Sequence, residues 1–133
     1  MNFSFSDAER RFADLAREFA RTLVHPQAAR IDETGAYPNG LVAEAAALGL
    51  LGVTAPREVG GAGQSYVAYA AALEEIAAAS ASLAVILVVH NSLVVDPLVE
   101  FGTPDQQRRW LPDLAAGRTL GAFALTEIGR AHV

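Results

Sequence analysis

The sequence contains neither cysteine nor lysine. The absence of cysteine excludes disulfides, thiolate nucleophiles and thiolate metal ligands within these 133 residues. All ten basic residues are arginine, against fifteen acidic residues, so the formal net charge is −5. Because the arginines form no basic stripe, we expect no nucleic-acid-binding surface.

Targeting and metal-binding signals are also lacking. The N-terminus, MNFSFSDAERRF, has no basic stretch followed by an apolar one, so we expect no secretory leader and a cytoplasmic location. The abundance of Ala, Gly and Arg is typical of a GC-rich, bacterial genome. His25, His90 and His132 share no metal-ligand spacing with one another or with a carboxylate cluster, and we therefore expect no metal site.

Apolar residues are abundant. Hydrophobic residues make up 52% of the chain and charged residues 19%, which is typical of a globular domain. The uncharged run from Ile76 to Val95 has the length of a bilayer span. Ser80, Ser82 and the His90-Asn91-Ser92 triplet interrupt it, so we interpret it as a helix buried inside a helical protein, with His90 hydrogen-bonded in the core or in a pocket wall. A small membrane protein is the alternative, and solubility without detergent would exclude it.

Helix signals begin near the N-terminus. Ser6 and Glu9 have the spacing of a capping box. Pro26 predicts a kink or a restart, after which a second piece should run to about Glu33 and end at Gly35. The apolar stripe of the first helix is predicted to consist of Phe12, Leu15, Phe19 and Leu23.

Further helices follow along the chain. Asn39 is the predicted N-cap of a helix through Leu48, and Thr103 with Gln106 predicts a second capping box. The other predicted elements are helices at 66–79, at 80 or 82 to 101 and at 103–117, and a strand at 120–126. The sequence therefore predicts an all-α, up-and-down domain of five to six helices that leads into the first strand of something else.

The order of the segments points to a family. ARIDETGAYP, LGLLGVTAPREVGGAG, ALEEIAAASASLA, VVHNSL and FGTPDQQRRWLPDLAAGRTLGAFALTE follow one another as in acyl-CoA dehydrogenases. The chain resembles the N-terminal helical domain of that family over residues 3 to 127. The resemblance implies that residues 1–119 form this helical domain and that residues 120–127 are the first strand of a truncated middle β-domain.

The resemblance implies an FAD-dependent enzyme. Members of the family oxidise an acyl-CoA thioester to the 2,3-enoyl-CoA, with a glutamate base that belongs to the C-terminal part of the family and is absent here. They pass electrons to an electron-transferring flavoprotein and usually form homotetramers. We therefore expect the 133-residue chain alone to bind no FAD and to be inactive. Three alternatives remain: an acyl-CoA oxidase, a flavin monooxygenase relative, or a stand-alone helical interaction module.

The resemblance also implies two sets of site residues. The flavin-facing strand of the family matches Phe123, Ala124, Leu125 and Thr126. The lining of the acyl-chain tunnel matches Val85, Ile86, Val89 and Leu93, which share one face of an ideal helix. An ordinary strand residue at Thr126 and an ordinary core stripe on the helix are the competing interpretations.

The last six residues have a separate explanation. Ile128-Gly129-Arg130-Ala131-His132-Val133 is the translation, in one frame, of the common short-read sequencing adapter AGATCGGAAGAGCACACGTC. Our hypothesis is that residues 128–133 are an assembly artefact. Sequencing the source DNA past codon 127 tests it, and a natural continuation unlike the family's P-x-x-G-S-D would contradict the family resemblance as well.

Overall fold

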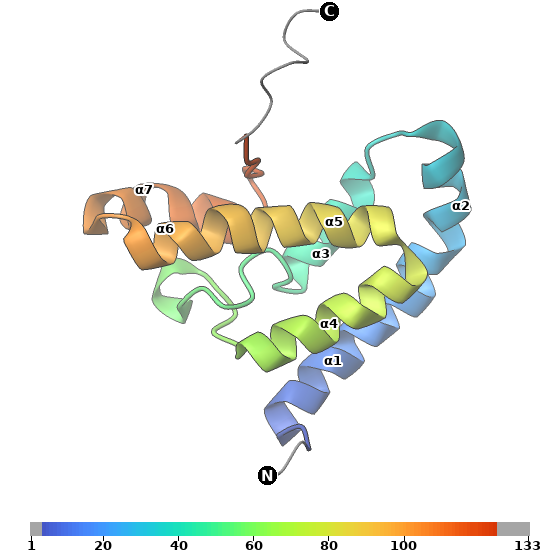
Figure 1. Cartoon of the computed structure of the whole chain (residues 1–133), viewed down its shortest axis with the longest axis horizontal. Coiled ribbons are helices and arrows are strands. Elements are labelled where there is room, and N and C mark those ends of the chain that lie inside the picture. The colour runs from blue at the N-terminus through green and yellow to red at the C-terminus, as the bar shows by residue number, and fades with distance from the viewer. Residues whose placement is uncertain (1–3, 125–133) are drawn as a thin grey trace, which may run out of the picture.

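Five helical runs make up residues 4–124, the part of the chain that this computed structural model describes (Figure 1). The first run joins α1 (Asp7–Phe19), the π-turn η1 (Ala20–Val24) and α2 (His25–Thr34). The second and third are α3 (Asn39–Ala47) and α4 (Tyr66–Ala79), with the short turn η2 (Arg57–Val59) between them. The fourth joins α5 (Ala81–His90), the π-turn η3 (Asn91–Val95) and α6 (Asp96–Phe101), and the fifth is α7 (Pro104–Ala115). The predicted all-α class with five to six helices is confirmed.

Side-chain caps fix the helix starts. The Ser6 hydroxyl accepts a hydrogen bond from the backbone N–H of Glu9, whose carboxylate accepts one from the N–H of Ser6, and Thr103 and Gln106 repeat this capping box at α7. Both predicted boxes are confirmed. The prediction that Asn39 caps α3 is wrong by one position, because Pro38 is the N-cap and Asn39 is the first helical residue.

The two π-turns change which side chains face inward. A π-turn adds one residue to a turn and so shifts the apolar face of the helix by one position. The predicted apolar stripe of the first helix is therefore wrong at its last residue. Leu23 is 39% exposed, and Val24 is fully buried in the core in its place. Pro26 lies two positions beyond η1, and the wide turn gives room for a proline ring that would clash in a regular helix.

The core lies where α1, α3, α4 and α5 meet. Helices α1 and α4 lie side by side, and α5 returns antiparallel to α4 after the turn at Ser80 (Figure 1). A second, smaller cluster beside α7 consists of Ala55, Val95, Leu111 and Leu114. The helical run α5–η3–α6 contributes to both clusters and is therefore the central element of the fold.

The same run, Ala81–Phe101, is long and apolar enough to cross a membrane by length and composition alone. Core helices of water-soluble proteins meet the same test. Here the run buries His90 and Asn91, whose side chains hydrogen-bond to other segments of the chain. These contacts agree with the interpretation of this run as a core helix.

The chain leaves α7 through Gly117 and continues past α5 as an irregular segment. Leu120–Ala124, the described part of the predicted strand, has no strand pairing within residues 4–124. A strand is defined by hydrogen bonds to a neighbouring strand, and none of the described segments supplies one. The remainder of the predicted strand and residues 128–133 lie outside the described residues.

Candidate functional site

An apolar groove lies between the second half of α5 and the segment that follows α7. Val85, Ile86 and Val89 line it from the helix, and Leu120, Gly121 and Ala122 form the wall from the later segment. Tyr37, from the loop between α2 and α3, also lines the groove. Val85 is 60% exposed although it is a large aliphatic residue, because the groove is open to solvent on one side. The groove thus brings together residues from three segments that are far apart in the sequence.

The wall of the groove is attached to α5 through a buried histidine. His90 is 1% exposed, and its Nδ1 accepts a hydrogen bond of 3.0 Å from the backbone N–H of Gly121. Its Nε2 lies 3.0 Å from the carbonyl of Leu51 and 3.2 Å from that of Leu114. An amide must donate and a carbonyl must accept, so these partners fix the neutral tautomer that carries its proton on Nε2. The prediction of a hydrogen-bonded core histidine is confirmed.

The same segment also packs tightly on the next turn of the helix. A Cβ atom at Gly121 would lie 2.5 Å from Cγ1 of Val94, which is closer than any real contact allows. Only glycine fits there. Val94 is four positions after His90, within the π-turn η3, so the two side chains hold Gly121 from one side of the helix.

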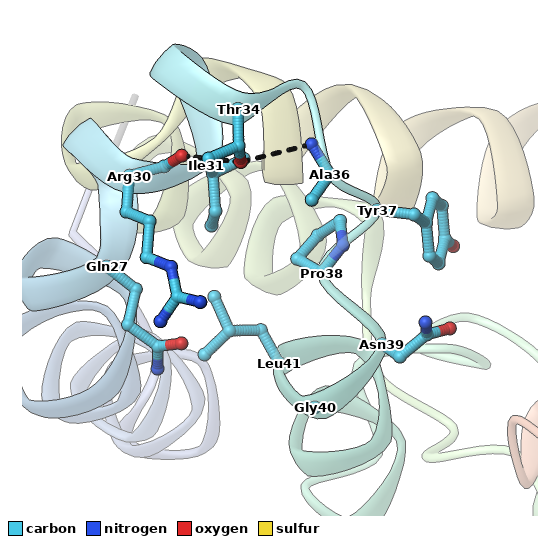
Figure 2. Close-up of a pocket in the computed structure, with 10 residues that line it drawn as sticks. All are labelled: Gln27, Arg30, Ile31, Thr34, Ala36, Tyr37, Pro38, Asn39, Gly40 and Leu41. Atoms are coloured by element: carbon cyan, nitrogen blue, oxygen red, sulfur yellow. Dashed lines mark hydrogen bonds between the residues drawn. The ribbon is translucent and has the colours of Figure 1, made fainter.

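The third side of the groove is the loop that carries Tyr37. The Thr34 hydroxyl donates a 2.7 Å hydrogen bond to the carbonyl of Arg30 and accepts one of 3.2 Å from the N–H of Ala36 (Figure 2). This pair of bonds fixes the turn between α2 and α3 just before Tyr37. On its other side the loop borders a second hollow of mixed polar and apolar lining, in which Figure 2 shows Gln27 and Arg30 beside Leu41.

The predicted substrate residues are placed as follows. Val85, Ile86 and Val89 share the groove, as the resemblance implies. Leu93 does not line it and is 41% exposed. The π-turn η3 explains the difference: it shifts the helix face by one residue, so Val94 takes the inward place that a regular helix would give to Leu93.

The predicted cofactor residues lie beyond the groove wall. Phe123, 48% exposed, and Ala124, also exposed, follow Ala122 directly, while Leu125 and Thr126 lie outside the described residues. The groove positions missed by sequence reasoning are Tyr37, Leu120, Gly121 and Ala122. A glycine inside a predicted strand was the one available signal, since such a glycine often marks a close approach of another chain segment.

The chemistry of the groove is that of an apolar binding surface. Tyr37 is its only titratable lining residue, and partial burial raises the pKa of that phenol, so it stays neutral at neutral pH. Within residues 4–124 no group of three or more His, Asp or Glu side chains is arranged to hold a metal ion. These residues can hold a hydrocarbon chain, and they provide no acid–base pair for catalysis.

The segment next to the groove has exposed backbone groups. Within residues 4–124 the backbone of Phe123 and of Ala124 makes no hydrogen bond, and both residues are exposed. Their backbone groups are available to the polar edge of an isoalloxazine ring, whose reduced form such donors stabilise. FAD bound there would stand beside the groove.

Comparison with known proteins identifies relatives over most of the chain. The family model for the acyl-CoA dehydrogenase N-terminal domain matches residues 6–118. The human mitochondrial short-chain specific acyl-CoA dehydrogenase is 42% identical over 113 residues, which cover 85% of this chain and 27% of that protein. An acyl-CoA dehydrogenase of Bacillus subtilis is 41% identical over 85% of this chain and 30% of that protein. The chain thus spans less than a third of the length of these relatives.

Solved structures share the fold. Butyryl-CoA dehydrogenase of Megasphaera elsdenii matches with a TM-score of 0.91 and 34% identity, over 96% of this chain and 34% of that one. A chain in a structural study of the electron transferring flavoprotein of Acidaminococcus fermentans matches with a TM-score of 0.92 and 29% identity, over 97% and 34% of the two chains. A glutaryl-CoA dehydrogenase of Mycobacterium smegmatis, in complex with FADH2, matches with a TM-score of 0.82 and 31% identity, over 88% and 30%.

Proposed function

The chain belongs to the acyl-CoA dehydrogenase family, as its N-terminal domain, and from that premise we propose that it forms the acyl-binding part of a flavin-dependent acyl-CoA dehydrogenase. The substrate is an acyl-CoA thioester, which the full enzyme oxidises to the 2,3-enoyl-CoA. The observation that carries this proposal is the apolar groove in which Val85, Ile86 and Val89 face Leu120 and Ala122.

The groove suits a hydrocarbon chain for a simple physical reason. Every methylene group moved from water into an apolar site contributes about 0.8 kcal/mol to binding. The side chains of Val85, Ile86 and Val89 offer only aliphatic surface, and the neutral Tyr37 lines the groove without adding a charge. One relative described above is named short-chain specific, and another is a butyryl-CoA dehydrogenase. Both names support a short acyl chain in the substrate.

FAD, when bound, supplies the acceptor for the hydride that leaves the β-carbon of the substrate. In this proposal the backbone of Phe123 and Ala124 would hold the ring next to the groove wall, whereas Leu125 and Thr126, which the resemblance also implies, lie outside the described residues. The FADH2 bound by the related glutaryl-CoA dehydrogenase supports a flavin in the family. An electron-transferring flavoprotein and a homotetrameric assembly complete the proposal for the full-length enzyme.

Acyl binding can be tested on the 133-residue chain with methyl-labelled NMR. We expect butyryl-CoA to shift the methyl signals of Val85, Ile86 and Val89 more strongly than CoA without an acyl chain does. Val67 is a matched control, because it is a valine of similar exposure, 50% against 60% for Val85, on α4 and outside the groove lining. Identical shifts with CoA and butyryl-CoA, or shifts at Val67 as large as those at Val85, would contradict acyl binding in the groove.

The same purified chain also tests whether residues 1–133 bind FAD or catalyse the reaction without the other domains of the enzyme. We expect it to carry no flavin absorbance and no dehydrogenase activity, because it spans only 27% of the human relative and 34% of butyryl-CoA dehydrogenase. A bound flavin spectrum would show that residues 1–133 hold FAD without further domains.

A further inference from the structure

The groove wall depends on contacts that the proposed reaction does not itself require. Leu120 and Ala122 are not part of a helix or of a paired strand, and Leu120 is 40% exposed. Within the described residues Gly121 is the only member of 120–124 that makes a hydrogen bond, the one to Nδ1 of His90. The position of this wall is therefore set mainly at a single residue.

We propose that His90 is a positioning residue for the acyl site: through Nδ1 and with Val94 it fixes Gly121, and thereby places Leu120 and Ala122 opposite Val85 and Val89. The inference deepens the proposed function, since it explains what keeps the wall of the acyl groove in place. His90 does not line the groove, so it acts through Gly121 and not on the ligand.

The geometry gives His90 two separable tasks. Nε2–H donates to the carbonyls of Leu51 and Leu114, and so joins the loop after α3 to the end of α7. Nδ1 accepts from Gly121, and this bond serves only the groove wall. A side chain that merely filled the core would need neither the acceptor on this side nor the close contact between Gly121 and Val94.

Burial keeps Nδ1 of His90 unprotonated, so that it can accept the hydrogen bond from Gly121. Desolvation lowers the pKa of His90, so the ring is neutral at neutral pH and its Nδ1 lone pair is available to Gly121. All three groups that the ring contacts by hydrogen bonds are backbone groups, and no side-chain acid or base is among its hydrogen-bond partners.

Two substitutions separate the two tasks. Glutamine at position 90 places its amide nitrogen near the position of Nε2 and offers no acceptor at Nδ1. Asparagine places its amide oxygen near the position of Nδ1 and cannot reach the carbonyls of Leu51 and Leu114. His90→Gln should therefore release Gly121 and keep the link to α7, whereas His90→Asn should do the reverse.

The measurement is amide hydrogen exchange by NMR on the full 133-residue chain, without ligand. We expect exchange at Gly121 to accelerate about fivefold or more in His90→Gln, which is the loss of one net hydrogen bond, and to stay near the wild-type rate in His90→Asn. The amide of Gln64, which donates a 2.8 Å hydrogen bond to the carbonyl of Val53, is the reference within each spectrum. Equal acceleration at Gly121 in both variants, relative to Gln64, would overturn the proposal.

A second measurement covers the case in which a variant fails to fold. The imidazole ¹⁵N spectrum of the wild-type chain should show His90 as the Nε2–H tautomer with an unprotonated Nδ1. The opposite tautomer would overturn the proposal without any substitution. Neither experiment uses an acyl ligand, so a failure here is distinguishable from a failure of acyl binding in the groove.

Discussion

The two long helical runs of the molecule each contain a π-turn, and a proline lies two positions beyond each: Pro26 after η1 and Pro97 after η3. Around η1 the polar side chains serve their own helix, since Gln27 donates to the carbonyl of Leu23 at 3.0 Å and Thr22 to that of Glu18 at 2.7 Å, both at the surface. Around η3 His90 and Asn91 are buried, Ser92 and Asp96 are half-buried, and all four bond to remote segments of the chain.

Asn91 is the clearest case of that difference. It is fully buried, donates 2.9 Å hydrogen bonds to the carbonyls of Leu50 and Leu87, and accepts one of 3.1 Å from the N–H of Val53. One side chain thus satisfies the widened turn and also holds the loop after α3. The same backbone irregularity is a local adjustment in one helix and the meeting point of several segments in the other.

The largest effect that tests this difference is expected from Asn91→Ala. It leaves the buried N–H of Val53 and the carbonyl of Leu50 without this partner, and each such group costs about 1–3 kcal/mol. We expect urea denaturation to show a loss of about 3 kcal/mol or more in the free energy of unfolding. Gln27→Ala is the matched control, because Gln27 makes the same bond to the carbonyl four residues back, and it should cost at most about 0.5 kcal/mol. Similar losses in both variants would remove the distinction between the two turns.

The structural features that depend only on neighbouring residues could be predicted from the sequence. The capping boxes at Ser6 and Thr103 are contained within four residues, and both are confirmed. Pro26 signals the irregularity at η1, whereas the helix from 80 or 82 to 101 is predicted as regular in spite of Pro97. The long-range hydrogen bonds of Asn91 and His90 span 24 to 41 positions, and no local pattern specifies them.

Both misplaced apolar residues have one physical cause. Regular helical spacing predicts Leu23 on the inward face, and the resemblance implies Leu93 beside Val85, Ile86 and Val89. In each helix a π-turn moves the inward place to the next residue, Val24 or Val94. For the site this means that Val85, Ile86 and Val89, which precede η3, could be predicted together. The wall from Leu120 to Ala122 could not be, because its position depends on long-range contacts with His90 and Val94.

A smaller effect is expected from Gly121→Ala, which tests the contact with η3. The added methyl group would collide with Val94, and overpacking of this kind costs about 1–3 kcal/mol. Because Gly121 packs on Val94 and donates to His90, we expect the segment to detach locally, with loss of the nuclear Overhauser contacts between residue 121 and Val94. The control is Gly40→Ala in the first turn of α3, where a Cβ meets nothing within 4 Å and alanine should leave these contacts unchanged. Persistence of the contacts between residue 121 and Val94 in Gly121→Ala would show that the segment stays in place despite the added methyl group.

His90, the residue before η3, should make the free energy of unfolding depend on pH. Burial lowers the pKa of its ring from the ordinary value of 6.5, so the unfolded chain binds a proton at a pH where the folded chain does not. The contribution of His90 to stability is therefore complete above pH 6.5 and is lost as the pH falls through the lowered pKa. The difference between the urea midpoints of the wild type and His90→Asn should shrink over that range. A difference that is constant from neutral pH into the acid range would contradict a neutral, buried ring.

The smallest effect is expected at η1, from Thr22→Val. The threonine hydroxyl bonds to the carbonyl of Glu18 on its own helix, and both residues are exposed, so water can replace this bond when the hydroxyl is removed. We expect a change in the free energy of unfolding within about 0.5 kcal/mol in either direction. The test is a urea titration beside Asn91→Ala under the same conditions. A loss at Thr22 as large as the loss at Asn91 would mean that η1, too, holds more than its own helix, and the contrast between the two turns would have to be abandoned.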